Sequence, residues 1–294
     1  MKDSIRKSFV DLSSAFCCPF CREKMMLTED GKSLVCQGGR RHCFDISASG
    51  YVNLLPSHPG GGDSRDAVRA RSAFLNSGHY APVADTLCAV LAEHLPQRGI
   101  VIDAGCGEGY YSARIAHDGF DVIGFDLSKY AVESAAKRSV RENAFGGGHA
   151  LFGVAGIFNM PVPDSCAAAV TNIFAPCAPG EYGRVLSDGG ILVVVSAGPL
   201  HLMGLKSLLY ETAYENGDRA DLPSDWKMAE QRRVTYDITL DTEDEIMNLF
   251  SMTPYYWRTS AADRDKLTGR GSLTTPVDVM ITVYNKPDIY KETL

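Results

Sequence analysis

The middle of the chain alternates between short apolar runs and longer segments in which apolar residues recur at helical spacing. Apolar runs occupy residues 99–105 and 121–128, and a helical pattern follows each of them. Two more apolar runs lie at residues 167–176 and 189–198. Strands and helices that alternate in this way form a mainly parallel sheet with helices on both faces. The pattern therefore predicts an α/β domain whose ligands bind beyond the carboxyl ends of the strands.

The front of the chain has a different pattern. Residues 44–56 alternate between apolar and polar positions, as a short strand does. Glycines at residues 60–62 indicate a flexible joint, after which a helical pattern begins. We predict a small N-terminal module over residues 1–59 and a main domain over residues 60–294, which opens with a linker and a helix at 60–81.

The composition is that of an ordinary globular protein. The chain has 294 residues, of which 45% are hydrophobic and 22% charged. No apolar run reaches the roughly 18 residues that span a bilayer, and the first 16 residues are too mixed and charged for a cleavable signal. We therefore expect a cytoplasmic protein with no membrane partner.

Charge is distributed unevenly along the chain. The formal net charge is −7, yet residues 1–75 carry 11 Lys and Arg against 8 Asp and Glu. The front is thus the part expected to face an anion. Arg65, Arg69 and Arg71 are candidates for phosphate contacts, and a solvated helix face is the alternative interpretation for each of them.

Cysteines gather in the front module. Cys18 and Cys21 stand in "CPFC", and Cys36 and His42 follow in "VCQGGRRHC". Two such pairs, brought together by a turn, can form a closed tetrahedral zinc site, with Cys43 as the alternative to His42. Buried free cysteines are the other interpretation, which the doubled pairing disfavours. We expect one zinc ion, whose loss would unfold the module and leave cofactor binding largely intact.

A glycine-rich turn, "DAGCGEGYY", follows the first apolar run of the main domain. Gly105 and Gly107 fill the first two glycine positions of a dinucleotide fingerprint, but Tyr110 stands at the third, which argues against NAD. The order D-x-G-x-G, which begins at Asp103, resembles the signature of S-adenosylmethionine (SAM) methyltransferases. Asp126 ends the next predicted strand, 23 positions later, where an acid can bind ribose hydroxyls. A helix N-cap is the alternative role for Asp126.

Three residues lie where the later predicted strands end. Asn172 and Cys177 belong to "NIFAPC", and His201 stands where the last apolar run gives way to a helix. The active site of such a sheet opens at these strand ends. A surface or capping role for His201 is as well supported by position alone.

Together these motifs resemble the bacterial 23S ribosomal RNA (guanine-N1)-methyltransferase family along nearly the whole chain. The matching segments are "CPFC", "FDISASGYVNLLP", "GDSRDAVRARSAFLNSGHY", "DAGCGEGYY", "IFAPC", "GPLHLMGLK" and "MTPYYWR". The resemblance implies a Rossmann-like SAM-dependent methyltransferase domain behind a small zinc-binding, RNA-recognition module.

The resemblance also implies roles for particular residues. The zinc positions fall on Cys18, Cys21, Cys36 and His42. The cofactor contacts fall on Tyr80, Gly107, Glu108 and His201. One departure is Gly204, which stands where the family pattern has an acidic residue.

The implied reaction transfers the methyl group of SAM to N1 of one guanine in a 23S rRNA hairpin. Neutral guanine carries a hydrogen on N1, so a proton must leave, and Asp63, His79 and Asn172 are candidates for handling it or for contacting the guanine edge. A paired base hides N1, so the target must be unpaired or flipped and could stack on Phe174 or Trp257.

Three other functions stay open. The "APC" segment is similar to the Pro-Cys nucleophile of cytosine-C5 methyltransferases, in which Cys177 would attack the base. A small-molecule SAM methyltransferase would have no obvious use for the zinc module. A silent RNA-binding protein would have no use for the cofactor motifs. The sequence leaves a homodimer open.

Overall fold

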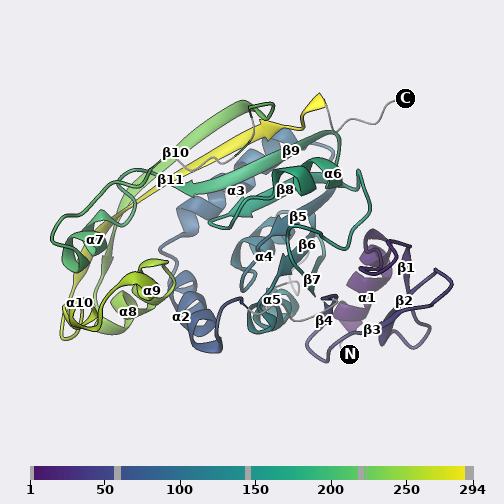
Figure 1. Ribbon diagram of the computed structural model, residues 1–294, viewed down its shortest axis with the longest axis horizontal. Helices are drawn as coiled ribbons and strands as arrows, with labels where there is room; N and C mark the ends of the chain where they lie inside the picture. Colours follow the sequence, from purple (N-terminus) through teal and green to yellow (C-terminus); the bar gives the residue numbers. More distant parts are fainter. Residues whose placement is uncertain (1–2, 56–60, 143–146, 218–221, 223, 289–294) are drawn as a thin grey trace.

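The computed structural model describes residues 3–55, 61–142, 147–217, 222 and 224–288. An eight-stranded sheet runs through the main domain in the order β10-β11-β9-β8-β5-β6-β7-β4 (Figure 1). The six strands from β9 to β4 are parallel to one another. They are β4 (Tyr51–Asn53), β5 (Ile100–Ala104), β6 (Asp121–Asp126), β7 (Ala150–Val154), β8 (Ala167–Ile173) and β9 (Leu186–Ala197).

Helices cover both faces of this sheet, as the sequence pattern predicts. Successive residues of a strand point to opposite faces, and Val101 and Ile102 of β5 accordingly belong to two different hydrophobic cores. The Val101 core includes α3 (Ala81–His94), α4 (Tyr110–His117) and α5 (Lys129–Glu142). The Ile102 core includes α6 (Pro179–Val185) and the front of the chain.

The front module packs directly on the main domain. It contains α1 (Asp3–Leu12), the short 3-10 helix η1 (Ser13–Ala15), and an antiparallel sheet of β1 (Met25–Leu27), β2 (Ser33–Cys36) and β3 (Cys43–Asp45). The ring of Phe16 meets the ring of Phe125 edge-on, with centroids 6.1 Å apart. The module therefore shares a hydrophobic core with the large sheet.

The predicted strand at residues 44–56 is two strands, β3 and β4. The chain turns between them at Gly50, whose φ of +92° favours glycine. β4 then pairs in parallel with β7 at the edge of the large sheet. Residues that the sequence assigns to the front module thus extend the main sheet, and the predicted boundary at residue 59 itself lies outside the described residues.

A long hairpin extends the sheet at its other side. Its strands are β10 (Lys227–Leu240) and β11 (Leu273–Asn285), which are antiparallel to each other and to β9. Between them the chain forms α8 (Glu243–Ser251), α9 (Tyr255–Arg258) and α10 (Ala261–Asp265) at the far end of the hairpin (Figure 1). α8 packs against α2 (Arg65–Asn76), and α2 also contacts α5.

No helix in the described part of the chain is both long enough and apolar enough to cross a membrane.

Candidate active site and metal centre

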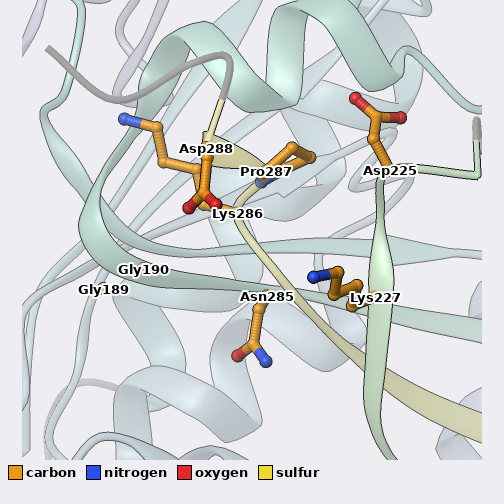
Figure 2. Close-up of a pocket in the computed structure, with 8 residues that line it drawn as sticks. All are labelled: Gly189, Gly190, Asp225, Lys227, Asn285, Lys286, Pro287 and Asp288. Carbon is orange, nitrogen blue, oxygen red and sulfur yellow. The ribbon is translucent and has the colours of Figure 1, made fainter. Parts of the chain in front are cut away.

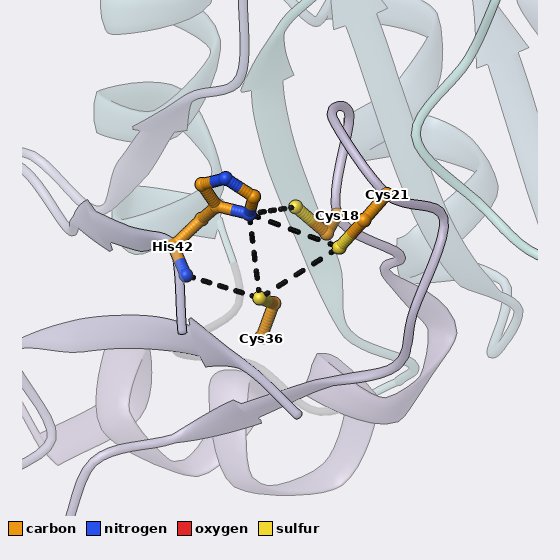
Figure 3. A group of neighbouring side chains, drawn as sticks. All are labelled: Cys18, Cys21, Cys36 and His42. Carbon is orange, nitrogen blue, oxygen red and sulfur yellow. Dashed lines mark hydrogen bonds between the residues drawn. The ribbon is translucent and has the colours of Figure 1, made fainter. Parts of the chain in front are cut away.

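Four side chains of the front module converge on one point (Figure 3). One ligand atom from each of Cys18, Cys21, Cys36 and His42 lies within 4.8 Å of the others. The three distances from His42 Nδ1 to the sulfur atoms are 3.4, 3.7 and 3.5 Å, and the Cys21 and Cys36 sulfurs are 3.9 Å apart. A tetrahedral zinc ion would require about 3.6 Å for nitrogen to sulfur and about 3.8 Å for sulfur to sulfur. The four residues therefore fit zinc.

The fourth member of this group is His42 rather than Cys43. Cys43 is exposed on β3 and stands outside the converging set. The backbone N–H of His42 donates to the Cys36 sulfur at 3.0 Å, which holds the imidazole beside the thiolates. The ring of Phe20 packs on the His42 ring, with centroids 4.9 Å apart.

The glycine turn joins β5 to α4 at the carboxyl edge of the parallel strands. Gly105, Gly107 and Gly109 have φ values of +84°, +54° and +78°, which side chains with a Cβ rarely adopt. A Cβ on Gly105 would lie only 2.7 Å from the Cβ of Ala175. The turn thus needs glycine for its conformation and for the close approach of the "APC" segment.

Asp103, near the end of β5, fixes the start of this turn. It is fully buried and accepts hydrogen bonds from the hydroxyl groups of Ser112 and Thr171, the latter at 3.1 Å. Burial raises the pKa of Asp103 to about 6. The side chain of Asp103 therefore links β5 to α4 and to β8 at the point where the glycine turn begins.

Asp126 faces the same turn from the end of β6. Its carboxylate accepts the backbone N–H of Gly107 at 3.0 Å and that of Ser128 at 2.8 Å. Burial raises its pKa. The bond to Ser128 is the helix-start role considered from sequence, while the bond to Gly107 ties Asp126 to the glycine turn. Asp126 thus both starts the following helix and binds the glycine turn, and the residue is partly exposed to solvent.

Asp63 and Arg71 form an ion pair beside Asp126. The backbone carbonyl of Asp63 accepts the Ser128 hydroxyl at 2.7 Å, and an Arg71 guanidinium nitrogen lies 3.5 Å from where a Cβ on Gly107 would stand. Arg71 is therefore directed toward the glycine turn and paired with Asp63, and its contact with phosphate stays a prediction.

Tyr80 and His201 meet at the carboxyl edge of β9. The Tyr80 hydroxyl lies 3.2 Å from His201 Nε2, and the backbone N–H of Asp278 donates to His201 Nδ1 at 3.2 Å. Nδ1 is thus an acceptor, so the neutral ring carries its proton on Nε2, and this N–H donates to the Tyr80 hydroxyl oxygen. Burial lowers the pKa of His201 to about 4, which keeps the ring neutral near pH 7.

Phe174 covers His201 at the end of β8. The two rings are nearly parallel, at 17°, with centroids 5.7 Å apart, and Phe174 is 45% exposed. Its φ of +51° is unusual for a residue with a Cβ. A strained backbone that presents an aromatic ring at a strand end is characteristic of a functional site.

The three candidates for proton handling lie in different surroundings. Asn172 is buried, and its amide donates to the Pro176 carbonyl at 2.7 Å and to the Tyr182 hydroxyl at 2.9 Å, which holds the "APC" segment in place. His79 lies 3.7 Å from Glu245 of α8. Asp63 pairs with Arg71 as described. No hydrogen bond joins any two of these candidates within the described residues.

Glu108 is the remaining cofactor residue expected from sequence. Its side chain is buried in an ion pair with Arg138, at 3.0 Å. Arg138 in turn donates to Asn76 at 2.8 Å, which links α5 to α2. The carboxylate of Glu108 thus supports the packing of α4, α5 and α2.

Asp278 is a site residue that the sequence analysis missed. It is fully buried on β11, accepts the backbone N–H of Leu200 at 2.9 Å, and pairs with Arg233 at 2.7 Å. These bonds fix the turn that carries His201. The signal in the sequence was an acidic residue between two valines, Val277 and Val279, of an apolar run.

Figure 2 shows a pocket of about 590 Å³ whose lining contains none of these residues. Its lining includes Gly189 and Gly190, at the amino end of β9, and Lys227 and Asn285 of the hairpin. The glycine turn, Phe174 and His201 stand at the carboxyl ends of the strands. The candidate active site and this pocket therefore lie at opposite ends of β9.

Two family models match the two parts of the chain. The model described as the N-terminal zinc ribbon of RlmA matches residues 16–59, and a methyltransferase-domain model matches residues 101–190. Together with the glycine turn and the Cys3His cluster, these matches define the class: a SAM-dependent methyltransferase with an N-terminal zinc ribbon.

Curated relatives cover nearly the whole chain. A 23S rRNA (guanine(748)-N(1))-methyltransferase of Streptomyces fradiae is 33% identical over 264 residues, which are 86% of this chain and 88% of that protein. A Micromonospora griseorubida protein, provisionally named a 23S rRNA (guanine-N(1)-)-methyltransferase, is 31% identical and covers 93% of this chain and 96% of its own length. The chain belongs to the 23S rRNA (guanine-N1)-methyltransferase family, which confirms the resemblance found in its motifs.

Proposed function

We propose that this protein transfers the methyl group of SAM to N1 of one guanine in a hairpin of 23S rRNA. The observation that carries the proposal is the similarity to relatives of that name along both the zinc ribbon and the methyltransferase domain. A fold-level likeness alone would leave the substrate open, because the same sheet supports many methyl transfers.

The residues around the glycine turn would hold SAM. We assign the contacts with its amino-acid part to the backbone at Gly105, Gly107 and Glu108, and the ribose contacts to Asp126. Tyr80 and His201 would close the site on the side of β9, since their hydroxyl and ring lie at the same edge of the sheet. SAM brings a strongly electrophilic methyl group, so the task left to the protein is mainly alignment.

Phe174 is our candidate for the surface that receives the guanine. Its exposed ring stands at the end of β8, next to the "APC" segment that packs on Gly105. A flipped base gains stacking energy on such a ring, which itself stacks on the ring of His201. Trp257 is also exposed, on α9 of the hairpin lobe, and remains the second candidate.

Three residues are candidates for accepting the proton that leaves guanine N1 or for contacting the guanine edge. Asp63, beside Asp126, and His79, beside Glu245 of α8, are the candidates with a basic side chain. Asn172 is the candidate for a contact with the guanine edge, although its amide already donates to the Pro176 carbonyl and the Tyr182 hydroxyl.

The zinc ribbon and exposed arginines of the ribbon and of α2 would bind the rRNA backbone. Arg40 and Arg41 are exposed beside His42, and Arg65 and Arg69 are exposed along α2. Residues 1–75 carry a net positive charge and the rest of the chain a net negative charge, which favours contact of the front part with the rRNA backbone. We propose that the protein acts on rRNA in the cytoplasm. Sedimentation with and without the hairpin would distinguish a monomer from a homodimer.

Methyl transfer to isolated rRNA tests the proposal. Purified protein with methyl-labelled SAM should label protein-free 23S rRNA and leave 16S rRNA unlabelled. The Phe174→Ala variant should bind SAM as the wild type does but require a higher rRNA concentration for half-maximal rate. Absence of label in 23S rRNA, as free RNA and as ribosomal particle, would refute the proposed function.

A further inference from the structure

The loop of residues 155–162 connects the cofactor edge of the sheet to the zinc ribbon. It leaves β7 at the edge of the sheet where Asp126 ends β6, and the backbone N–H of Ala155 donates to the Asp126 carbonyl at 3.1 Å. Three residues further on, Phe158 is 68% exposed. The first half of the loop thus borders the site proposed for SAM.

The second half of the loop is bound by the zinc ribbon. Arg22 comes directly after the zinc ligand Cys21, and its guanidinium donates to the carbonyls of Met160 and Val162 at 2.9 and 2.8 Å. The backbone N–H of Cys17 donates to the carbonyl of Pro161 at 2.9 Å. Three consecutive carbonyls of the loop therefore accept hydrogen bonds from residues that flank the Cys18–Cys21 pair.

The position of Arg22 depends on the fold of this ligand pair. Its backbone N–H donates to the Cys18 carbonyl at 2.9 Å, and its φ is +61°, a conformation that arginine rarely adopts. Such a conformation persists only where the surrounding structure enforces it. The surroundings here are a pair of zinc ligands, Cys18 and Cys21.

A second arginine binds the same two carbonyls from the main domain. Arg184 of α6 donates to Met160 and Val162 at 3.1 and 3.0 Å, and its charge is balanced by Glu181 and Asp164 at 2.6 Å each. The loop is thus held between two guanidinium groups. The hold by Arg184 is independent of the metal, whereas the hold by Arg22 comes from the zinc ribbon.

We propose that Arg22 is a positioning residue through which the zinc ribbon keeps the 155–162 loop in the conformation that binds SAM. Loss of Arg22, or of the metal that orders its backbone, weakens SAM binding without touching a SAM contact. This consequence is the opposite of the expectation from sequence, where the metal and the cofactor site are independent. The inference rests on the SAM-binding part of the proposed function and not on its RNA substrate.

The size of the effect follows from a population argument. The hydrogen bonds of Arg22 hold the loop and do not involve SAM, so we expect them to act by raising the fraction of molecules whose loop is ready to bind. The apparent dissociation constant is the intrinsic value divided by that fraction. For a competent fraction of roughly a tenth to a third with Arg184 alone, the dissociation constant of SAM rises about three- to tenfold.

Calorimetric titration of the full chain with SAM tests this coupling. Arg22→Ala and Arg22→Gly both remove the guanidinium, and the glycine variant also relieves the strained φ. Both should retain zinc and bind SAM about three- to tenfold more weakly, with a raised KM for SAM and an unchanged kcat at saturation. Lys24→Ala is the matched control, because Lys24 is an exposed cation of the same module whose side chain makes no hydrogen bond or ion pair within the described residues.

Removal of zinc from the wild type provides the second arm. Chelation should weaken SAM binding at least as much as Arg22→Ala does, and re-addition of zinc should restore it. Equal SAM affinity in wild type and in zinc-loaded Arg22→Ala and Arg22→Gly would overturn the inference, as would unchanged affinity after chelation. A wild type that binds no SAM would instead refute the proposed function, so the two failures are distinguishable.

Discussion

Single residues at the carboxyl edge of the sheet are the contacts that we propose for SAM. Asp126 is the plainest example, because it belongs both to the glycine turn and to the start of α5. Its carboxylate already accepts two backbone N–H groups and retains lone pairs for ribose hydroxyls.

Asp126→Ala should weaken SAM binding by roughly 1–3 kcal/mol, because a hydrogen bond to a charged group is lost. Titration calorimetry measures this change, and a thermal melt of the free protein shows whether the turn itself has been damaged. Unchanged SAM affinity in the variant would contradict the assignment, and so would wild-type affinity for NAD equal to that for SAM.

His201 should make the stability of the protein depend on pH. Its pKa is about 4 in the folded protein and about 6.5 when the chain is unfolded, so between these values the unfolded chain binds a proton that the folded protein does not. Stability is therefore lost as the pH falls through this window. Between pH 7.5 and pH 5, His201 should account for about 2 kcal/mol of the free energy of unfolding.

His201→Gln removes this titration and keeps a side chain that can bind Tyr80 and the Asp278 N–H. Urea unfolding of zinc-loaded, SAM-free protein at both pH values compares the variant with the wild type. The stability advantage of the wild type should shrink by about 2 kcal/mol at the lower pH. An advantage that stays constant would mean that the imidazole is protonated in the folded state.

The sequence predicts residues of this site where their chemistry is local. The glycine turn, Asp103 and Asp126 follow from spacing along one strand–turn–helix unit. Asp278 and Arg138 could not be found in this way, because each is defined by partners far away in the sequence, Leu200 and Arg233 for Asp278 and Glu108 for Arg138. The network that fixes His201 is a property of tertiary packing.

At the scale of elements, the zinc ribbon is a set of short strands that the metal would hold together. β1, β2 and β3 have three or four residues each, too few to form a stable sheet alone. The ligands come from the segment before β1 and from the end of β2 and the turn before β3. Zinc binding therefore contributes directly to folding of this part.

Protein purified without added zinc should contain about one zinc ion per chain. Cys36→Ser and His42→Ala should lose most of the metal, because each removes one of four ligands. Cys43→Ser is the matched control: it changes the neighbouring exposed thiol and should keep the zinc. Metal analysis by mass spectrometry provides the measurement, and a metal-free wild type under reducing conditions, or loss of zinc in Cys43→Ser but not in His42→Ala, would contradict the assignment.

Element prediction succeeded where periodicity is strong and failed where pairing is remote. The strands and helices of the main domain alternate as the apolar pattern predicts. β4 was not separated from β3, because a three-residue strand carries little periodicity and its partner, β7, is about a hundred residues away. The packing of α8 against α2 could likewise not be predicted from the local pattern, because the two helices are far apart in the sequence.

At the scale of the whole molecule, the two parts of the chain share one hydrophobic core and one large sheet. The front module contributes β4 to the sheet and Phe9 and Phe16 to the core on the Ile102 face. This arrangement fixes the zinc ribbon relative to the glycine turn.

The most direct test of this account is the identity of the methylated atom. Wild type and Cys177→Ala should be incubated with SAM and 23S rRNA, and the product mapped by reverse transcription and nucleoside mass spectrometry. We predict N1-methylguanosine at one position, which blocks the Watson–Crick edge and stops reverse transcription, and substantial activity in Cys177→Ala because no enzyme nucleophile is needed. A product of 5-methylcytidine, with a covalent adduct between Cys177 and 5-fluorocytosine RNA and no activity in Cys177→Ala, would contradict the account.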